Sequence, residues 1–186
     1  RHRELFVMER KEEQMALLRS HPESHLARWF LRKRLLEDGD FAGAEPLARR
    51  QIAEGRGNVA DAYNDLAWAA AFAPQVTEQA LDDGRRAVSM SNERSRACLH
   101  TLATLYAQSG RPDEAMQLLV KSVEVSGKRP EDDDWYVVGR AAEEYGLTDE
   151  ARRLYRLVEK PKQRSALSTW HLAQRRLAAL AEGGQQ

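Results

Sequence analysis

The stretch LHTLATLYAQSGRPDEAMQLL, residues 99–119, contains two short helical patterns separated by a turn. Large apolar residues recur every three or four positions, which is the period of one face of an α-helix. Gly110 can close the first helix, and Asp113 can cap the second. Ala103 and Ala115 stand among much larger residues, one in each helix. We infer a helical hairpin that crosses closely at these alanines, because larger side chains would force the helix axes apart.

The same hairpin pattern recurs along the chain. An alanine follows the turn at Ala44, Ala80, Ala115 and Ala151, and successive alanines lie 36, 35 and 36 residues apart. Alternating β-branched residues, which would indicate strands, are almost absent. A repeat of this length with two helices per unit is typical of an α-solenoid, in which each hairpin buries its open face on the next. The sequence therefore predicts an all-α fold.

Two of these units resemble the tetratricopeptide repeat (TPR), a family of helical hairpins that stack into a superhelix. Its pattern places large, small and aromatic residues at fixed positions of the first helix, and alanine in the second. One unit matches it with Leu99, Leu102, Ala103, Tyr106, Ala115 and Leu119. The next unit matches it with Trp135, Val138, Gly139, Ala142, Ala151 and Tyr155.

The two earlier units depart further from the pattern. The unit that contains Tyr63 and Ala67 is similar to a bacterial variant of the repeat, but Gly84 replaces a large residue in it. In the first unit, Arg32 occupies the position of the small residue. Pro46 lies just inside the second helix of that unit, where we expect it to bend the helix or delay its start.

The resemblance implies one α-α superhelix of about four TPR-like hairpins, spanning residues 1–186 as a single domain. An N-terminal helix is expected within 1–22, and a capping helix and tail within 162–186, since the ends of a solenoid need a polar outer face. The chain opens on Arg1, so we expect it to be a segment of a longer or processed polypeptide. The expected repeats span residues 23–57, 58–93, 94–130 and 131–161.

Composition excludes several classes of function. The chain has 29 Lys and Arg against 29 Asp and Glu, so it has no net attraction for nucleic acid or an anionic membrane. No apolar run approaches the roughly 20 residues that span a bilayer, and no short apolar core follows a basic start as in a signal peptide. A single cysteine, Cys98, rules out an internal disulfide framework and is expected to be a small buried apolar residue.

The sequence contains no pattern that indicates catalysis or a cofactor. The acidic run Asp132, Asp133 and Asp134 has the residue types of a divalent metal site, but it precedes a helix, where carboxylates favour the helix dipole. The histidines lack the spacing of a zinc site, and neither a nucleophile motif nor a glycine-rich phosphate loop occurs. Clusters of basic residues are mixed with acidic ones, as on solvated helix faces. We therefore expect no catalytic residues, no metal and no cofactor.

The resemblance directs attention to the concave face of the superhelix, which the first helices of the repeats line. Helical spacing from the packing residues places polar and aromatic side chains there. Such a groove suits a peptide or a partner helix, because amides and Arg140 bond to backbone or carboxylate groups while Trp68 and Tyr136 anchor the partner. The predicted groove residues are Asn64, Trp68, Phe72, His100, Thr104, Gln108, Tyr136, Arg140 and Glu144.

We therefore expect a non-catalytic interaction or scaffold module that binds a protein or peptide, or another domain of its own polypeptide. One alternative is an RNA-binding helical repeat, because residues 109–130 also resemble the pentatricopeptide repeat; neutral charge and varied groove residues argue against it. A second alternative is a regulatory or scaffold segment of a larger enzyme. The sequence favours a monomer without membrane insertion, and a cytoplasmic over an extracytoplasmic location.

Overall fold

The computed structural model describes residues 12–127, 129–162 and 165–183, and no residue in these ranges forms a strand. The predicted all-α fold is confirmed. The expected N-terminal helix lies partly outside the described residues, of which 12–19 are helical. The helices that follow are α2 His25–Asp38, α3 Phe41–Glu54, α4 Val59–Ala70, α5 Glu78–Met90, α6 Arg96–Gln108, α7 Pro112–Ser126, α8 Asp134–Glu144, α9 Thr148–Leu157 and α10 Thr169–Gly183.

Polar caps and left-handed glycines determine where the helices begin and end. The side chains of Ser24, Asp40, Asn58, Thr77 and Ser95 each accept a hydrogen bond from a backbone N–H in the first turn of α2 to α6, respectively. These bonds satisfy donors that a helix cannot satisfy internally. Both α2 and α3 end at glycines with positive φ, which an L side chain adopts only with strain.

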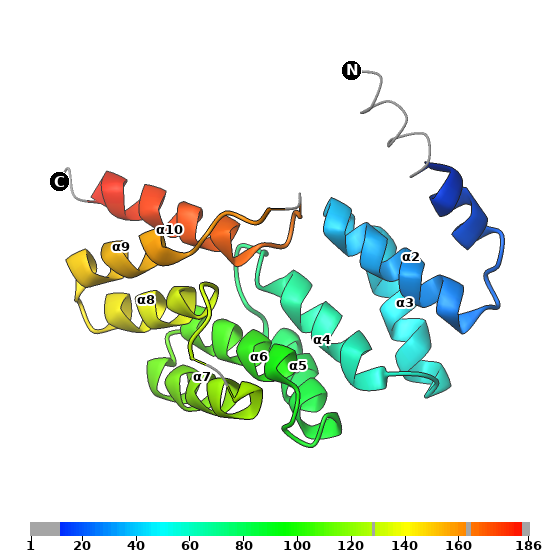
Figure 1. Cartoon of the computed structure of the whole chain (residues 1–186), viewed down its shortest axis with the longest axis horizontal. Coiled ribbons are helices and arrows are strands. Elements are labelled where there is room, and N and C mark those ends of the chain that lie inside the picture. The colour runs from blue at the N-terminus through cyan, green and yellow to red at the C-terminus, as the bar shows by residue number, and fades with distance from the viewer. Residues whose placement is uncertain (1–11, 128, 163–164, 184–186) are drawn as a thin grey trace.

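The helices form antiparallel pairs that follow one another along an arc (Figure 1). The second helix of each pair packs against the first helix of the next, and α4, α6, α8 and α10 also pack against one another in sequence. This arrangement is a helical-repeat superhelix, as the spacing of the alanines predicts.

Small residues lie at the helix crossings, as expected. Ala103 of α6 and Ala115 of α7 are both fully buried. In the next pair, Gly139 of α8 lies under the ring of Tyr155 of α9, where a Cβ atom would stand only 2.6 Å from ring carbon Cε1. The crossing of α8 and α9 therefore has room only for the hydrogen atom of glycine. The crossing of α6 and α7 has room for the methyl group of alanine and for nothing larger.

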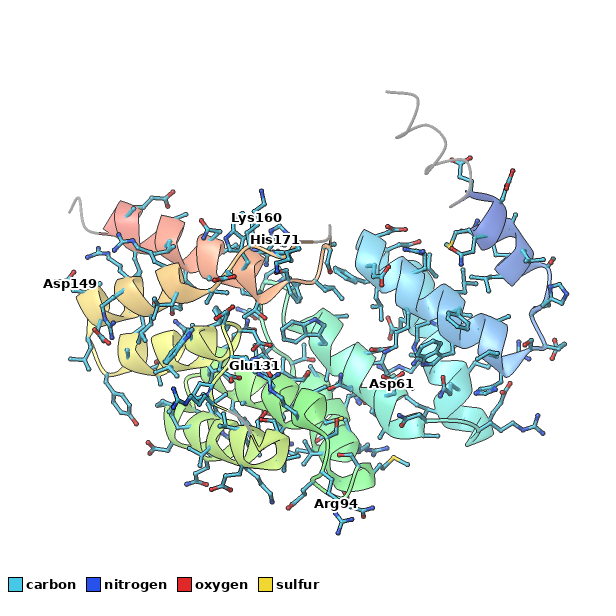
Figure 2. The ribbon with its side chains drawn as sticks, in the orientation of Figure 1. Asp61, Arg94, Glu131, Asp149, Lys160 and His171 are labelled. Carbon is cyan, nitrogen blue, oxygen red and sulfur yellow. The ribbon has the colours of Figure 1, made fainter. Side chains whose placement is uncertain are left out.

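The first pair replaces this small residue with Arg32, which is 1 % exposed. Its guanidinium donates to Asp65 and Asp61 of α4, each at 2.7 Å, and to Gln51 of α3 at 2.5 Å. Lys33 donates to the same two carboxylates at 2.7 Å each. Asp61 lies on the side of α4 that faces α2 (Figure 2). The arginine thus joins the first pair to the second through ion pairs.

Pro46 does not delay the start of its helix, so that alternative of the prediction is wrong. Helix α3 begins at Phe41, capped by the Asp40 side chain, and Pro46 lies in its second turn. The cap and the first turn precede the proline, and the missing N–H of Pro46 removes only one backbone donor from the helix.

We predict that Ala103→Leu lowers the free energy of unfolding by about 2 kcal/mol, because extra methyl groups at a helix crossing force the axes apart. Urea denaturation followed by circular dichroism measures this change. Ala178→Leu is the matched control, since Ala178 is exposed on α10. Equal unfolding midpoints for Ala103→Leu and Ala178→Leu would contradict the close crossing.

We also predict that Arg32→Ala destabilises the fold by about 3 kcal/mol, since it leaves the buried Asp65 carboxylate with only one of its two cationic partners, Lys33. Arg34→Ala on the same helix removes an exposed arginine that pairs with Glu37. This control is expected to leave the midpoint of urea denaturation close to that of the unmodified protein. A similar midpoint for both variants would show that Arg32 contributes no more than a surface charge.

Candidate functional site

Residues 165–183, here called the C-terminal strap, run along the concave side of the superhelix. The strap consists of a non-helical segment, 165–168, which bends at residues 166 and 167, followed by α10. After α9 the chain reaches toward α2, and α10 then returns alongside α9 (Figure 1). The expected capping helix is therefore present, and the residues before it extend across the first helices of several repeats.

Backbone and side-chain bonds fix the strap at both ends of the superhelix. Ala166 N–H donates to the carbonyl of Glu37 at the end of α2, at 2.9 Å. Arg175 donates to the carbonyl of Phe72 at 2.9 Å, and Arg176 forms an ion pair with Glu143 of α8. Leu167 packs against the cores of both the first pair and the later pairs. The strap therefore connects the ends of the arc.

Most of the predicted groove residues are buried beneath the strap or between helices. Trp68, Asn64 and Gln108 are partly exposed, and Glu144 is exposed at the end of α8. The buried members are Phe72, His100, Thr104, Tyr136 and Arg140. Thr104 is fully buried, and its hydroxyl donates to the His100 carbonyl of its own helix. This set is thus a mixture of packing residues and accessible residues.

Trp68 lies at the centre of the concave side. Its indole Nε1–H donates to the Leu167 carbonyl of the strap at 3.2 Å, and its ring meets Phe72 edge-on with centroids 5.3 Å apart. Asn64 precedes it by one turn on the same face of α4. The Asn64 side-chain oxygen is buried and has no hydrogen-bond partner in the part of the chain that the structure describes. A buried acceptor without a donor is costly, so this position favours a ligand that supplies one.

Two cavities flank the strap. One has a volume of about 590 Å³ and is bounded by the loop after α4, by α6, α8 and α10. The other, of about 650 Å³, lies between Trp68, the start of α8 and the beginning of the strap. Lys160 and His171 both lie near the start of the strap (Figure 2), and the Lys160 ammonium stands 5.5 Å from the centroid of the Trp170 ring.

Glu143 is the centre of a charged network that joins α8, α9 and α10. Its carboxylate accepts from Tyr155 Oη at 2.6 Å and pairs with Arg140 at 2.8 Å and with Arg176. Burial alone would raise the pKa of Glu143, but hydrogen bonds from Arg176 and Tyr155 and the charge of Arg140 outweigh it and lower the pKa. Burial and the adjoining carboxylate raise the pKa of Tyr155 well above its ordinary value.

The acidic run before α8 forms a second charged cluster with α6. One ligand-type atom from each of His100, Asp133 and Asp134 lies within 4.8 Å of the others, which is the spacing of a metal site. The Arg96 guanidinium already contacts both carboxylates, at 2.9 and 3.1 Å. Burial opposes ionisation of Asp133, but His100 and Arg96 hold its pKa below the usual range. Arg96 therefore supplies the positive charge that these carboxylates need.

Helix capping also accounts for part of the acidic run. The Asp134 side chain accepts from the Glu131 backbone N–H at 2.8 Å, which closes the turn before α8. Asp133 occupies the cap position of α8, yet its side chain makes no capping hydrogen bond and pairs with Arg96 instead. Asp132 is exposed and joins neither arrangement.

The sequence did not predict that residues of the strap lie on the concave side. Arg175, Arg176 and Leu167 follow an irregular segment, and no pattern in it indicates that the chain returns across α2 and α4. The one available signal is the length of the connection, since eleven residues separate α9 from α10 where two or three residues link α2 to α3 and α6 to α7. A long connection in a repeat array indicates a departure from simple stacking.

The fold and its concave side define the class of the protein as a helical-repeat solenoid. Residues 96–128, a range that includes α6 and α7, match the family described as tetratricopeptide repeat. The chain therefore contains a tetratricopeptide repeat within its superhelix. No curated protein matches it in sequence. Tetratricopeptide repeats in general mediate protein–protein interactions or act as scaffolds and are generally non-catalytic. Among the described helices, none combines the length and apolar character needed to cross a membrane.

We predict that Glu143 stabilises the fold in a pH-dependent way. Because its pKa is lowered by folding, its contribution is fully present above the unfolded value of about 4.3 and is lost as pH falls through the folded value. Thermal unfolding should give a lower Tm for Glu143→Gln than for the unmodified protein at neutral pH, and the two Tm values should converge as the pH falls below the unfolded value. Glu124→Gln, at an exposed position of α7, is the control. A Tm difference independent of pH would contradict this assignment.

Proposed function

We propose that the chain is a non-catalytic interaction module that binds a protein partner on its concave side, between the first helices of the repeats and the strap. The observation that carries this proposal is the buried, unpartnered oxygen of Asn64 beside the partly exposed ring of Trp68. An extended peptide supplies backbone N–H donors to such an acceptor, and an indole provides apolar contact area for its side chains.

The two cavities support the same location. They open on either side of the strap, and aromatic and polar groups of α4, α6 and α8 line them. Apolar surface with a few convergent polar groups is typical of binding sites in general. The clusters of ionisable residues on this side are paired internally, as shown for Glu143 and Asp133, and this pairing favours a role in positioning helices over a role in chemistry.

We predict that Asn64→Ala weakens capture of a native partner and leaves stability unchanged. The substitution removes an acceptor that has no internal hydrogen bond, so it costs the free protein little. Loss of one bound N–H partner is expected to reduce affinity by about fivefold. The experiment immobilises the unmodified chain and the variant at equal density and quantifies partners captured from native lysate by mass spectrometry, after circular dichroism of both.

Gln117→Ala is the matched control, because Gln117 is exposed on α7, on the outer side of the superhelix. A partner depleted by Asn64→Ala and retained by Gln117→Ala supports binding on the concave side. A partner retained equally by both variants contradicts that location, and one depleted only by Gln117→Ala assigns binding to the outer side.

A further inference from the structure

The cavity of about 590 Å³ between α6, α8, α10 and the loop after α4 is rich in hydrogen-bond donors. Its polar lining includes Gln108, Tyr136 and three arginines, Arg140, Arg175 and Arg176. Apolar side chains, Val76 and Leu172 among them, form the remaining walls. Three guanidinium groups thus surround one cavity, and they differ in whether a carboxylate of the protein compensates their charge.

Two of the arginines have carboxylate partners. Arg140 is 8 % exposed and pairs with Glu143 at 2.8 Å and with Glu144 at 2.6 Å. Arg176 pairs with Glu143, donating from Nε as well as from a terminal nitrogen. The two carboxylates thus compensate the two guanidinium charges, and neither arginine needs a further anion.

Arg175 differs from both. It donates one hydrogen bond, to the Phe72 carbonyl at 2.9 Å, and its guanidinium stands 5.8 Å from the centroid of the Phe72 ring. Within the described residues no carboxylate pairs with it, although a guanidinium carries five N–H donors. The strap therefore holds Arg175, which is exposed, at the cavity without a carboxylate partner among the described residues.

Tyr136 adds a neutral donor to the same cavity. Its hydroxyl oxygen accepts from Gln108 Nε2 at 3.0 Å, and the other amide hydrogen of Gln108 goes to the Ala71 carbonyl at 3.1 Å. The hydroxyl hydrogen of Tyr136 is therefore free to donate. Burial raises the pKa of Tyr136, so the hydroxyl keeps this hydrogen at neutral pH.

The geometry points to a carboxylate-binding subsite in this cavity, where Arg175 and Tyr136 hold an acidic side chain of an extended, otherwise apolar segment of a partner protein. A single uncompensated guanidinium with one hydroxyl matches the charge and the two oxygens of a carboxylate. A phosphate group, with nearly twice the charge, would require a second free cation. The inference rests on the proposed function and names the chemistry of the partner.

This inference assigns a second role to the strap. Arg175 belongs to α10, so the subsite exists only when α10 is docked on α8 and α9. The strap consequently completes the binding surface, and a partner that binds there leaves it in place.

The test uses the full chain labelled with ¹⁵N and two acetylated, amidated pentapeptides, Ala-Leu-Glu-Ala-Ala and Ala-Leu-Gln-Ala-Ala. We expect the glutamate peptide to shift the resonances of the Gln108 side-chain amide and of Arg175 Nε–H saturably, and to bind about tenfold more tightly than the glutamine peptide. Arg175→Gln is expected to weaken binding of the glutamate peptide by about tenfold, and Tyr136→Phe by about fivefold.

Arg153→Gln is the matched control, because it removes the same charge from a side chain on α9 that is 63 % exposed and pairs with Glu150. Unchanged binding by this variant supports the subsite. Equal binding of the two peptides, shifts confined to other residues, no saturable shift, or equal weakening by Arg153→Gln and Arg175→Gln would overturn it.

Capture from lysate separates this inference from the proposed function. If Arg175→Gln retains a native partner that Asn64→Ala depletes, the carboxylate subsite is overturned while binding on the concave side stands. Loss of that partner from both variants, with retention by Arg153→Gln, supports both proposals.

Discussion

The close crossing of two helices at a small residue is the constraint on which this superhelix depends. Where Gly139 lies under the ring of Tyr155, and where Ala103 is buried in its hairpin, the helices approach until their backbones leave no space for a larger side chain. A hairpin this thin has too little core of its own, so it buries its open face on the next hairpin. The array, its curvature and its concave side all follow from that need.

The junction between the first and second hairpins depends on ion pairs, because Arg32 stands in the position of the small residue. Its ion pairs with Asp61 and Asp65 hold α2 against α4, and beside them a cavity of about 300 Å³ remains between the two hairpins. Apolar packing alone therefore does not fix the first hairpin. Leu167 contacts the cores on both sides of the junction, so the position of the N-terminal hairpin depends on a residue near the other end of the chain.

Local sequence predicted the features that depend on local physics. The helices and the small residues at the crossings depend on neighbours a few positions away, so helical periodicity predicts them well. The expected cap at Asp113 is wrong, because α7 begins at Pro112 and Asp113 lies within its first turn. The same reasoning placed Tyr136 and Thr104 in the groove, although the structure buries both. A helical period identifies a face and cannot tell what covers it. The strap covers this face through contacts about a hundred residues apart in sequence, between Trp68 and Leu167 and between Phe72 and Arg175, and periodicity contains no record of them.

The net charge of the chain likewise does not predict the local charge on the concave side. The equal totals of 29 basic and 29 acidic residues argue against an electrostatic partner, but screening limits each exposed charge to its surroundings within about 10 Å. In those surroundings Glu143 and Glu144 compensate Arg140 and Arg176, and no carboxylate of the described residues pairs with Arg175. A neutral chain thus carries a local positive site because folding distributes its carboxylates unevenly. If the concave side binds a partner as proposed, its selectivity depends on α10, which supplies Arg175, as much as on the repeats that supply the surface.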